Sequence, residues 1–165
     1  LRLDVGAIAK GYAVERVAAS AKADGVESLL ISVGGNVRTI GVRGDGKPWR
    51  AAIQSPDGDG VLYTLNVSDN SLVTSGDYQR YYTVDGQNYH HIIDPKTRMP
   101  ADYFSSVSVL CEDSAMADAL STALFCMPLA EGQALIKTLP DTEAFWIIPD
   151  GTEAFSDGFL TYVVE

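Results

Sequence analysis

The residues with the clearest chemical potential lie in a helical stretch near residue 120. Residues 116–124 are almost all small or apolar, so most of this helix should be buried. Asp118 and Thr122 are four residues apart and therefore lie one above the other on the same face. A buried carboxylate is costly unless it is paired or binds a cation, and carboxylate and hydroxyl oxygens suit Mg²⁺. The alternative is that Asp118 faces solvent and Thr122 hydrogen-bonds to its own helix.

A second stretch with chemical potential occupies residues 3–12. An apolar entry is followed by an acidic residue, by Gly6 and Gly11, and by Lys10. We expect an extended segment that passes through a tight turn into a helix beginning near Tyr12. Unpaired N–H groups at such a helix start favour anions such as phosphate, and Lys10 adds a positive charge. A purely structural strand-to-helix turn explains the same residues.

Two adjacent histidines, His90 and His91, form the third candidate. Consecutive strand residues face opposite ways, so only one of these side chains can point into a given site. Histidine titrates near neutral pH and is the usual proton-transfer residue, although a buried structural histidine is the commoner case. The run at 74–78, Thr-Ser-Gly-Asp-Tyr, offers hydroxyls, a flexible glycine and an aromatic ring, and is equally open to a structural role.

The charge of the chain narrows the class of ligand. A formal net charge of −10 argues against nucleic acid as a partner, because its phosphates reward clustered Lys and Arg. If the ligand is a phosphate compound, an acidic protein needs a metal ion or a local positive patch to hold it. Cys111 and Cys126 lack metal-ligand spacing, so we expect buried free thiols. The sequence contains no G-x-S-x-G elbow, Walker A loop or Rossmann glycine pattern.

The elements that must position these residues follow from apolar patterns and turn residues. We expect helices at about 12–23, 115–127 and 129–139, with Ser114 as the N-cap of the second. Strands are expected at 27–33, 36–43, 49–54, 61–67, 81–84, 87–91, 105–111 and 143–148.

Three hairpins should connect some of these strands. The first joins 36–43 to 49–54 across a polar loop, the second turns at Asp85-Gly86, and the third turns near Asp157-Gly158. These elements predict a single α+β domain, residues 1–165, with a mainly antiparallel sheet and about three packed helices.

The size and composition suit one globular domain. The chain has 165 residues, of which 46% are hydrophobic and 21% charged, enough to bury a real core. No segment is apolar for long enough to span a bilayer. The chain opens on Leu1, directly in a strand-like segment, so we expect a fragment whose export or lipid-anchor signal lies upstream.

Taken together and in order, five motifs resemble the ApbE family of flavin transferases (FAD:protein FMN transferases), formerly labelled thiamine-biosynthesis lipoproteins. The motifs are D-V-G-A-I-A-K-G-Y-A, S-V-G-G-N, T-S-G-D-Y-x-R-Y, H-H-I-I-D-P and A-D-A-L-S-T-A-L. They run from Leu3 to about Phe125 and correspond to the C-terminal part of family members. The N-terminal region, which supplies more of the FAD site in the family, is therefore expected to be absent. Glu15 departs mildly from the family pattern, which commonly has Asp there.

The resemblance implies a T-fold-like architecture and a Mg²⁺-dependent enzyme that cleaves the diphosphate of FAD. Such an enzyme transfers FMN through a phosphoester bond to a Thr or Ser of a partner protein and releases AMP. The implied metal ligands are the Ala7 carbonyl, Asp118 and Thr122. His91 is implied as the acid/base group at the acceptor hydroxyl, so His91 and Asp118 are the catalytic candidates. The implied FAD contacts are Asp4, Lys10, Ser75, Gly76 and Ile92.

Two other functions remain open. Water could replace the acceptor hydroxyl, which gives FMN and AMP by hydrolysis, or the chain could be a non-enzymatic module that stores or delivers FAD. The resemblance also implies a full-length protein held by a lipid anchor at the periplasmic or extracytoplasmic face of a bacterial membrane. The fragment alone is expected to bind FAD weakly or not at all and need not be active on its own.

Overall fold

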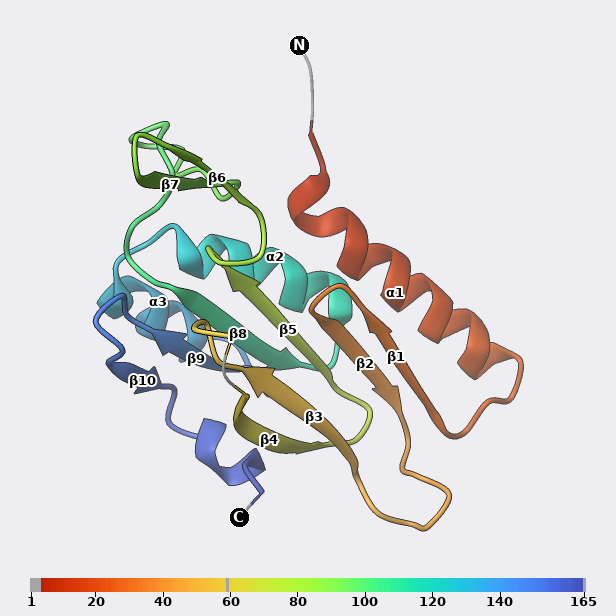
Figure 1. Cartoon of the computed structure of the whole chain (residues 1–165). Helices are drawn as coiled ribbons and strands as arrows, with labels where there is room; N and C mark the ends of the chain where they lie inside the picture. Colours follow the sequence, from red (N-terminus) through yellow and green to blue (C-terminus); the bar gives the residue numbers. More distant parts are fainter. Residues whose placement is uncertain (1–3, 59, 165) are drawn as a thin grey trace.

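The computed structural model describes residues 4–58 and 60–164 (Figure 1). Among these residues, no helix combines the length and the apolar character needed to cross a bilayer. The elements, in chain order, are α1 (Gly6–Ala23), β1 (Leu29–Val33), β2 (Asn36–Ile40), β3 (Trp49–Gln54), β4 (Val61–Val67), β5 (Ser71–Gly76), β6 (Tyr81–Val84), β7 (Gln87–His90), β8 (Ser106–Cys111), α2 (Ser114–Phe125), α3 (Leu129–Ile136), β9 (Glu143–Ile147), β10 (Glu153–Phe155) and the 3-10 helix η1 (Phe159–Tyr162).

Six strands form one antiparallel sheet in the order β1-β2-β5-β8-β9-β10. Helix α2 packs on β5 and β8, and α1 packs against α2 and the β1–β2 end of the sheet. The β3–β4 hairpin lies on the opposite side of the sheet (Figure 1). The predicted α+β fold, with antiparallel strands and three packed α-helices among the described residues, is confirmed.

Alternation along the strands builds a separate core on each face of the sheet. Val73 of β5 and Trp146 of β9 belong to the core under the helices. Their neighbours Leu72 and Phe145 belong to the core under β3–β4. Because successive strand residues point to opposite faces, two consecutive apolar residues in β5, and two in β9, contribute one side chain to each core. The central strands β5, β8 and β9 are therefore buried on both sides, and α2 packs on two of them.

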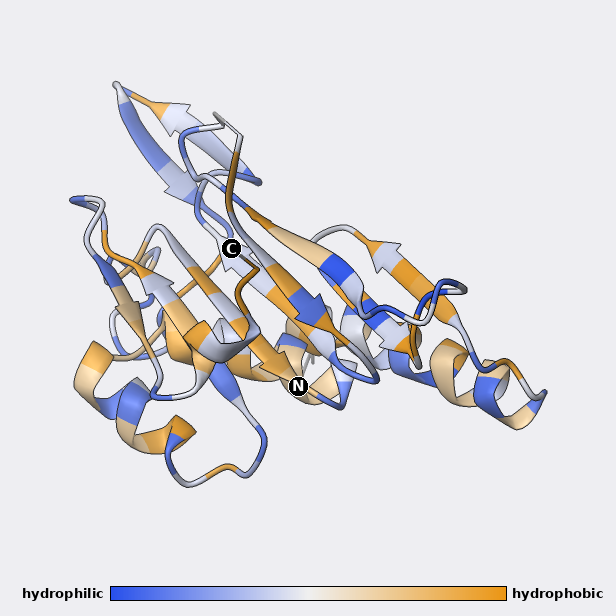
Figure 2. Ribbon diagram, turned by 90° about the horizontal axis from the view of Figure 1, so that it is seen from below, coloured by the Kyte–Doolittle hydropathy of each residue, from blue (hydrophilic) through white to orange (hydrophobic). Residues whose placement is uncertain are grey.

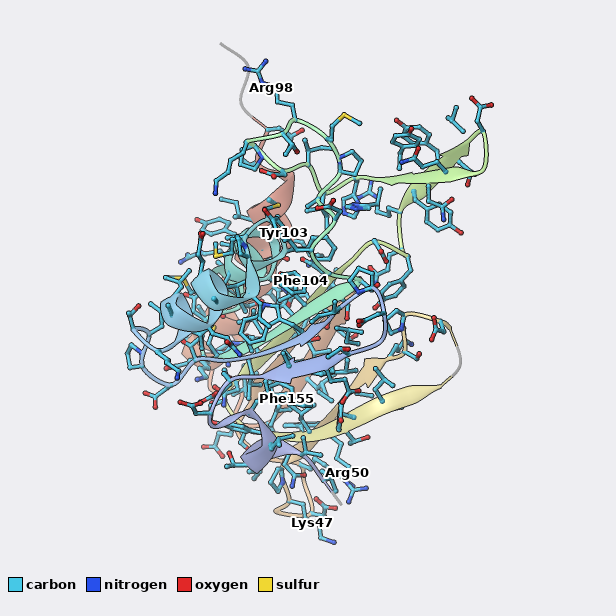
Figure 3. All side chains as sticks on the ribbon, turned by 90° about the vertical axis from the view of Figure 1, so that its left-hand side faces the viewer. Lys47, Arg50, Arg98, Tyr103, Phe104 and Phe155 are labelled. Atoms are coloured by element: carbon cyan, nitrogen blue, oxygen red, sulfur yellow. The ribbon has the colours of Figure 1, made fainter. Side chains whose placement is uncertain are left out.

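The β6–β7 hairpin stands apart from both cores. Figure 3 shows that it projects from the body, and Figure 2 shows that its residues are mostly neutral to hydrophilic. Its turn residues Asp85 and Gly86 both have positive φ, 49° and 80°, as a two-residue hairpin turn requires. The hairpin predicted at Asp85-Gly86 is therefore confirmed.

The other two predicted hairpins are wrong. β2 pairs with β1 and β5, whereas β3 pairs with β4. The cause is the tight turn at Gly34-Gly35, where both glycines have positive φ, because it joins β1 directly to β2. The last hairpin joins β9 to β10 through a turn that includes Gly151, while Asp157-Gly158 leads into η1.

Helix α1 begins at Gly6, so the predicted extended segment before Tyr12 is already helical. The Asp4 carboxylate accepts the Gly6 N–H at 2.7 Å, and the Val5 carbonyl accepts the N–H groups of residues 8 and 9. Because glycine is a poor helix former, Gly6 and Gly11 made the sequence pattern favour a helix start near Tyr12. The correction places Lys10 in the second turn of α1 and not at the helix entrance.

Asp113, and not Ser114, is the N-cap of α2. Its carboxylate accepts the N–H groups of Ala115 and Met116 at 2.7 and 2.9 Å. Ser114 is the first helical residue, and its hydroxyl donates instead to the Asn36 side chain at 2.8 Å. The helix also ends earlier than predicted, at Phe125.

Replacing Asp113 with alanine should lower the free energy of unfolding by about 1 kcal/mol, because two N–H groups lose their acceptor. Chemical denaturation of the full-length protein measures this loss. Asp24→Ala is the control, since Asp24 ends α1 and is exposed. Equal stability of the two variants would contradict the assignment of the cap.

Both cysteines are free, as predicted. Cys111 is buried at the end of β8, and Cys126 is half-buried at the C-terminal end of α2. Burial raises the pKa of the Cys111 thiol to about 11 and also raises the pKa of the Cys126 thiol. Both thiols therefore stay protonated near neutral pH and behave as small apolar groups.

Candidate functional site at the crossing of α1 and α2

The two long helices touch at Gly11 of α1. A Cβ atom at this position would overlap the Ser114 carbonyl oxygen and would lie 2.5 Å from Asp118 Cβ. Gly11 is therefore the residue that lets the backbone of α1 reach α2. This contact explains why a glycine occurs inside a helix at a cost of about 1 kcal/mol relative to alanine.

The same contact brings Asp118 to two donors of α1. Asp118 is only 4% exposed, and its Oδ1 lies 2.6 Å from Lys10 Nζ. Its Oδ2 accepts the Gly11 N–H at 2.7 Å. The alternative in which Asp118 faces solvent is therefore wrong. The ammonium and the N–H group give this buried carboxylate the partners that its burial requires.

Thr122 lies one turn after Asp118, and for this residue the structural alternative from the sequence is correct. Its hydroxyl donates to the Asp118 carbonyl at 3.3 Å, so Thr122 hydrogen-bonds to its own helix. Its Oγ1 also lies 3.4 Å from the Ser75 hydroxyl oxygen of β5. Ser121 completes this group, with its Oγ at 2.8 Å from that of Ser75 and 3.0 Å from the Asp118 carbonyl. The structure therefore brings Ser75 to the same helix face as Thr122.

The two crossing helices carry three oxygen donors suited to Mg²⁺. They are the Asp118 carboxylate, the Thr122 hydroxyl and the Ala7 carbonyl, one turn before Gly11. A regular helix directs the Gly11 N–H at the Ala7 carbonyl, and this N–H also reaches Asp118 Oδ2, so the two oxygens lie on the same side of α1. The Ala7 oxygen keeps a second lone pair for a cation. Asp118 already pairs with the positive charge of the Lys10 ammonium, so this carboxylate can accept a cation. Together with the two neutral oxygens, it fits a metal ion such as Mg²⁺.

Acidic clusters do not provide an alternative cation site. Across residues 4–58 and 60–164, no group of three or more His, Cys, Asp or Glu side chains could hold a metal ion. A cation at the α1–α2 crossing would therefore depend on one carboxylate supported by neutral oxygens. Mg²⁺ is commonly bound in this way, with phosphate and water completing its shell.

The two histidines have different environments. The ring of His90 has its Nε2 2.8 Å from the Ala101 carbonyl, and its Nδ1 accepts the Ile92 N–H at 3.2 Å. Both ring nitrogens of His90 are therefore engaged by backbone groups. His91 is exposed, and its Nδ1 lies 3.2 Å from the Arg80 carbonyl. Of the pair, His91 is the one whose ring is open to a reacting group.

Three other expected flavin contacts, Asp4, Ile92 and Gly76, lie in different surroundings. Asp4 is exposed, and its carboxylate accepts the Gly6 N–H at the start of α1. Ile92 is 5% exposed, and its side chain belongs to the core under the helices. Its N–H donates to His90 and its carbonyl accepts the Ala101 N–H at 3.0 Å, so only the second lone pair of this carbonyl is left for a ligand. Gly76 is buried at the end of β5, where a Cβ atom would overlap the Tyr78 ring.

A cleft of about 390 Å³ lies beyond the end of β5. It is lined by Pro56, Asp57, Gly58, Asp77, Tyr78, Tyr81, Asn88 and His90. Burial raises the pKa of the Asp77 carboxyl, although the nearby His90 opposes this shift, and burial together with the charge of Asp77 raises the pKa of Tyr78. The cleft is therefore a partly desolvated, acidic and aromatic recess that His90 helps to line.

The ApbE family model matches residues 1–146. The chain belongs to the ApbE family. Among curated relatives, an FAD:protein FMN transferase of Treponema pallidum is 38% identical, with 99% of this chain and 48% of the relative covered. Another from Vibrio cholerae is 39% identical, with 83% of this chain and 42% of the relative covered.

Solved ApbE structures share the fold. A crystal structure of the ApbE protein from Thermotoga maritima has a TM-score of 0.91 and 35% identity, covering 99% of this chain and 54% of that chain. The flavin transferase ApbE from Vibrio cholerae has a TM-score of 0.83 and 34% identity, covering 98% and 53%. This ApbE-family chain therefore spans about half the length of the relatives it matches.

Sequence reasoning on this ApbE-family chain missed two groups near the crossing. Ser121 was overlooked although it follows Asp118 by three residues, a spacing that places it on a neighbouring part of the same helix face. The salt bridge between Glu15 and Arg38, 23 residues apart, lacked any sequence signal. Such a pair is visible only once α1 and β2 are packed together.

Proposed function

We propose that the full-length protein containing this chain transfers FMN from FAD to a Thr or Ser hydroxyl of a partner protein. The transfer forms a phosphoester bond and releases AMP. The observation that carries this proposal is the pairing of Lys10 and Asp118 at the helix crossing, within a fold shared with proteins named FAD:protein FMN transferase. Because the chain spans about half of those relatives, the activity belongs to the full-length polypeptide.

Mg²⁺ is proposed to bind at the α1–α2 crossing. The Ala7 carbonyl, the Asp118 carboxylate and the Thr122 hydroxyl would hold it. When bound, Mg²⁺ supplies positive charge that neutralises the diphosphate and the charge that develops on the transferred phosphoryl group. A protein with a net charge of −10 needs such neutralisation to admit a diphosphate.

Lys10 is proposed to bind the diphosphate of FAD directly. Its side chain is 31% exposed, so the ammonium can turn from Asp118 toward a phosphate oxygen without unfolding α1. Asp4, Ser75 and the backbone of Gly76 and Ile92 are proposed as further FAD contacts. Ser75 has the strongest structural support, because its hydroxyl already lies 3.4 Å from that of Thr122.

His91 is proposed to accept the proton of the acceptor hydroxyl. Its ring is exposed, and the bond of Nδ1 to the Arg80 carbonyl leaves Nε2 as the nitrogen directed elsewhere. The acceptor oxygen then attacks the phosphorus of the FMN half, the bond from that phosphorus to the bridging oxygen breaks, and AMP leaves with that oxygen.

A location at the extracytoplasmic face of a membrane is proposed on the family resemblance alone.

Mass measurement of an acceptor separates the proposed transfer from its alternatives. The full-length protein is incubated with FAD, Mg²⁺ and an acceptor peptide containing Thr or Ser. A peptide that gains the mass of FMN, with AMP released, supports transfer. Free FMN and AMP with an unmodified peptide support hydrolysis, and intact FAD supports a binding module. Either of the last two outcomes would overturn the proposed transfer.

A further inference from the structure

A buried ion pair joins α1 to the sheet close to the candidate site. Arg38 of β2 is 2% exposed, and its Nε and Nη2 donate to the Glu15 carboxylate at 3.0 and 3.2 Å. Its remaining nitrogen, Nη1, donates to the Thr39 carbonyl at 2.7 Å. This two-pronged geometry is the strong form of an arginine–carboxylate contact. Charge neutralisation of Arg38 is one role of Glu15.

Glu15 has a second contact that a simple counter-ion does not need. Its Oε2 accepts the N–H of Ser114, the first residue of α2, at 2.8 Å. This N–H has no acceptor inside its own helix, and the N-cap Asp113 serves only the next two N–H groups. Glu15 therefore completes the capping of α2 from another helix.

The contacts between α1 and α2 form two rungs, one helical turn apart. Glu15 meets Ser114 at one rung, and Gly11 meets Asp118 at the other. Gly11 and Glu15 are four residues apart on α1, and Ser114 and Asp118 are four residues apart on α2. Both rungs therefore lie on one face of each helix. A displacement at the first rung therefore displaces the second by a similar amount.

We propose that Glu15 is a positioning residue for Asp118. By accepting the Ser114 N–H from its place on α1, it fixes where α2 lies along α1. The Asp118 carboxylate then reaches the Gly11 N–H and Lys10 at hydrogen-bonding distance. This inference rests on the proposed function only for its metal readout, because the positioning itself is visible without any ligand.

Two double variants separate positioning from charge neutralisation. Both carry Arg38→Met, which removes the buried cation, combined with either Glu15→Gln or Glu15→Leu. The glutamine oxygen can still accept the Ser114 N–H, whereas leucine cannot. Neither double variant leaves a buried charge without its partner, so a loss of charge pairing cannot distinguish them.

The direct readout is amide hydrogen exchange of Gly11 in the full-length protein without metal or FAD. Its exchange rate is divided by that of Val109, a fully buried residue in β8 that reports global unfolding. We expect the ratio to stay near wild type in the glutamine variant and to rise about tenfold in the leucine variant. Lys22→Met is the control, because the ion pair between Lys22 of α1 and Asp69 is exposed to solvent.

Mg²⁺ titration by calorimetry adds a second readout. We expect about tenfold weaker binding in the leucine variant than in the glutamine variant. Equal Gly11 exchange ratios in the two double variants would overturn the proposal and leave Glu15 as a counter-ion for Arg38. If wild type itself shows no Mg²⁺ binding, the proposed function fails while the exchange ratio still decides the role of Glu15.

Discussion

The substitution Asp118→Asn is expected to reduce FMN transfer by the full-length protein by roughly 10²–10³-fold or more. The asparagine side chain keeps the shape of aspartate but removes its charge, and its NH₂ group faces either Lys10 or the Gly11 N–H as a second donor. A proposed Mg²⁺ ligand is lost at the same time. The measurement is the initial rate of acceptor labelling at saturating FAD, together with Mg²⁺ affinity by calorimetry.

Asp45→Asn is the matched control for this result. Asp45 is exposed in the loop between β2 and β3, where it pairs with Arg43 at 2.9 Å and accepts the Lys47 N–H at 3.2 Å. Surface pairs of this kind contribute little, so activity and metal affinity should match wild type. If folded Asp118→Asn protein kept both wild-type activity and wild-type Mg²⁺ affinity, Asp118 would not be part of the site.

The substitution Gly11→Ala is expected to lower the free energy of unfolding by about 2 kcal/mol. The added methyl group overlaps the Ser114 carbonyl and crowds Asp118 Cβ, and a clash with backbone atoms cannot be relieved by side-chain rotation. The higher helix propensity of alanine offsets only about 1 kcal/mol of this strain. For a domain of this size, the melting temperature should fall by about 4–8 °C.

The same substitution should separate Asp118 from Lys10, so transfer activity should fall more than stability alone explains. Gly44→Ala is the control, because a Cβ atom there meets no heavy atom within 4 Å and the glycine lies in an exposed loop. Its melting temperature should stay within about 1–2 °C of wild type. A Gly11→Ala protein as stable and active as Gly44→Ala would show that the helices do not depend on this close approach.

Local patterns were enough to predict the class of the fold and the helix face that carries two of the candidate site residues. Asp85-Gly86 encodes its hairpin in two residues, because both must take positive φ and these types tolerate it. The four-residue spacing of Asp118 and Thr122 placed both on one helix face before any partner was known. Each of these signals depends on neighbours within a few residues.

The partners of these residues could not be predicted from spacing. Lys10 and Asp118 are 108 residues apart, and only the packing of α1 against α2 brings them to 2.6 Å. The start of α1 was misplaced because Gly6 and Gly11 read as breaks, whereas Gly11 serves helix contact. Similarly, the sequence allowed β2 to pair with β3. The tight turn at Gly34-Gly35 joins β2 to β1, so β2 pairs with β1 and not with β3.

A crystal structure of the full-length protein with Mg²⁺ and an adenine nucleotide tests the central claim most directly. We expect a six-coordinate ion at the α1–α2 crossing, with oxygens of Ala7, Asp118 and Thr122 at about 2.1 Å. Lys10 should turn from Asp118 toward a phosphate oxygen. An ion bound elsewhere, with Lys10 still paired to Asp118 and the nucleotide away from α1, would contradict the account.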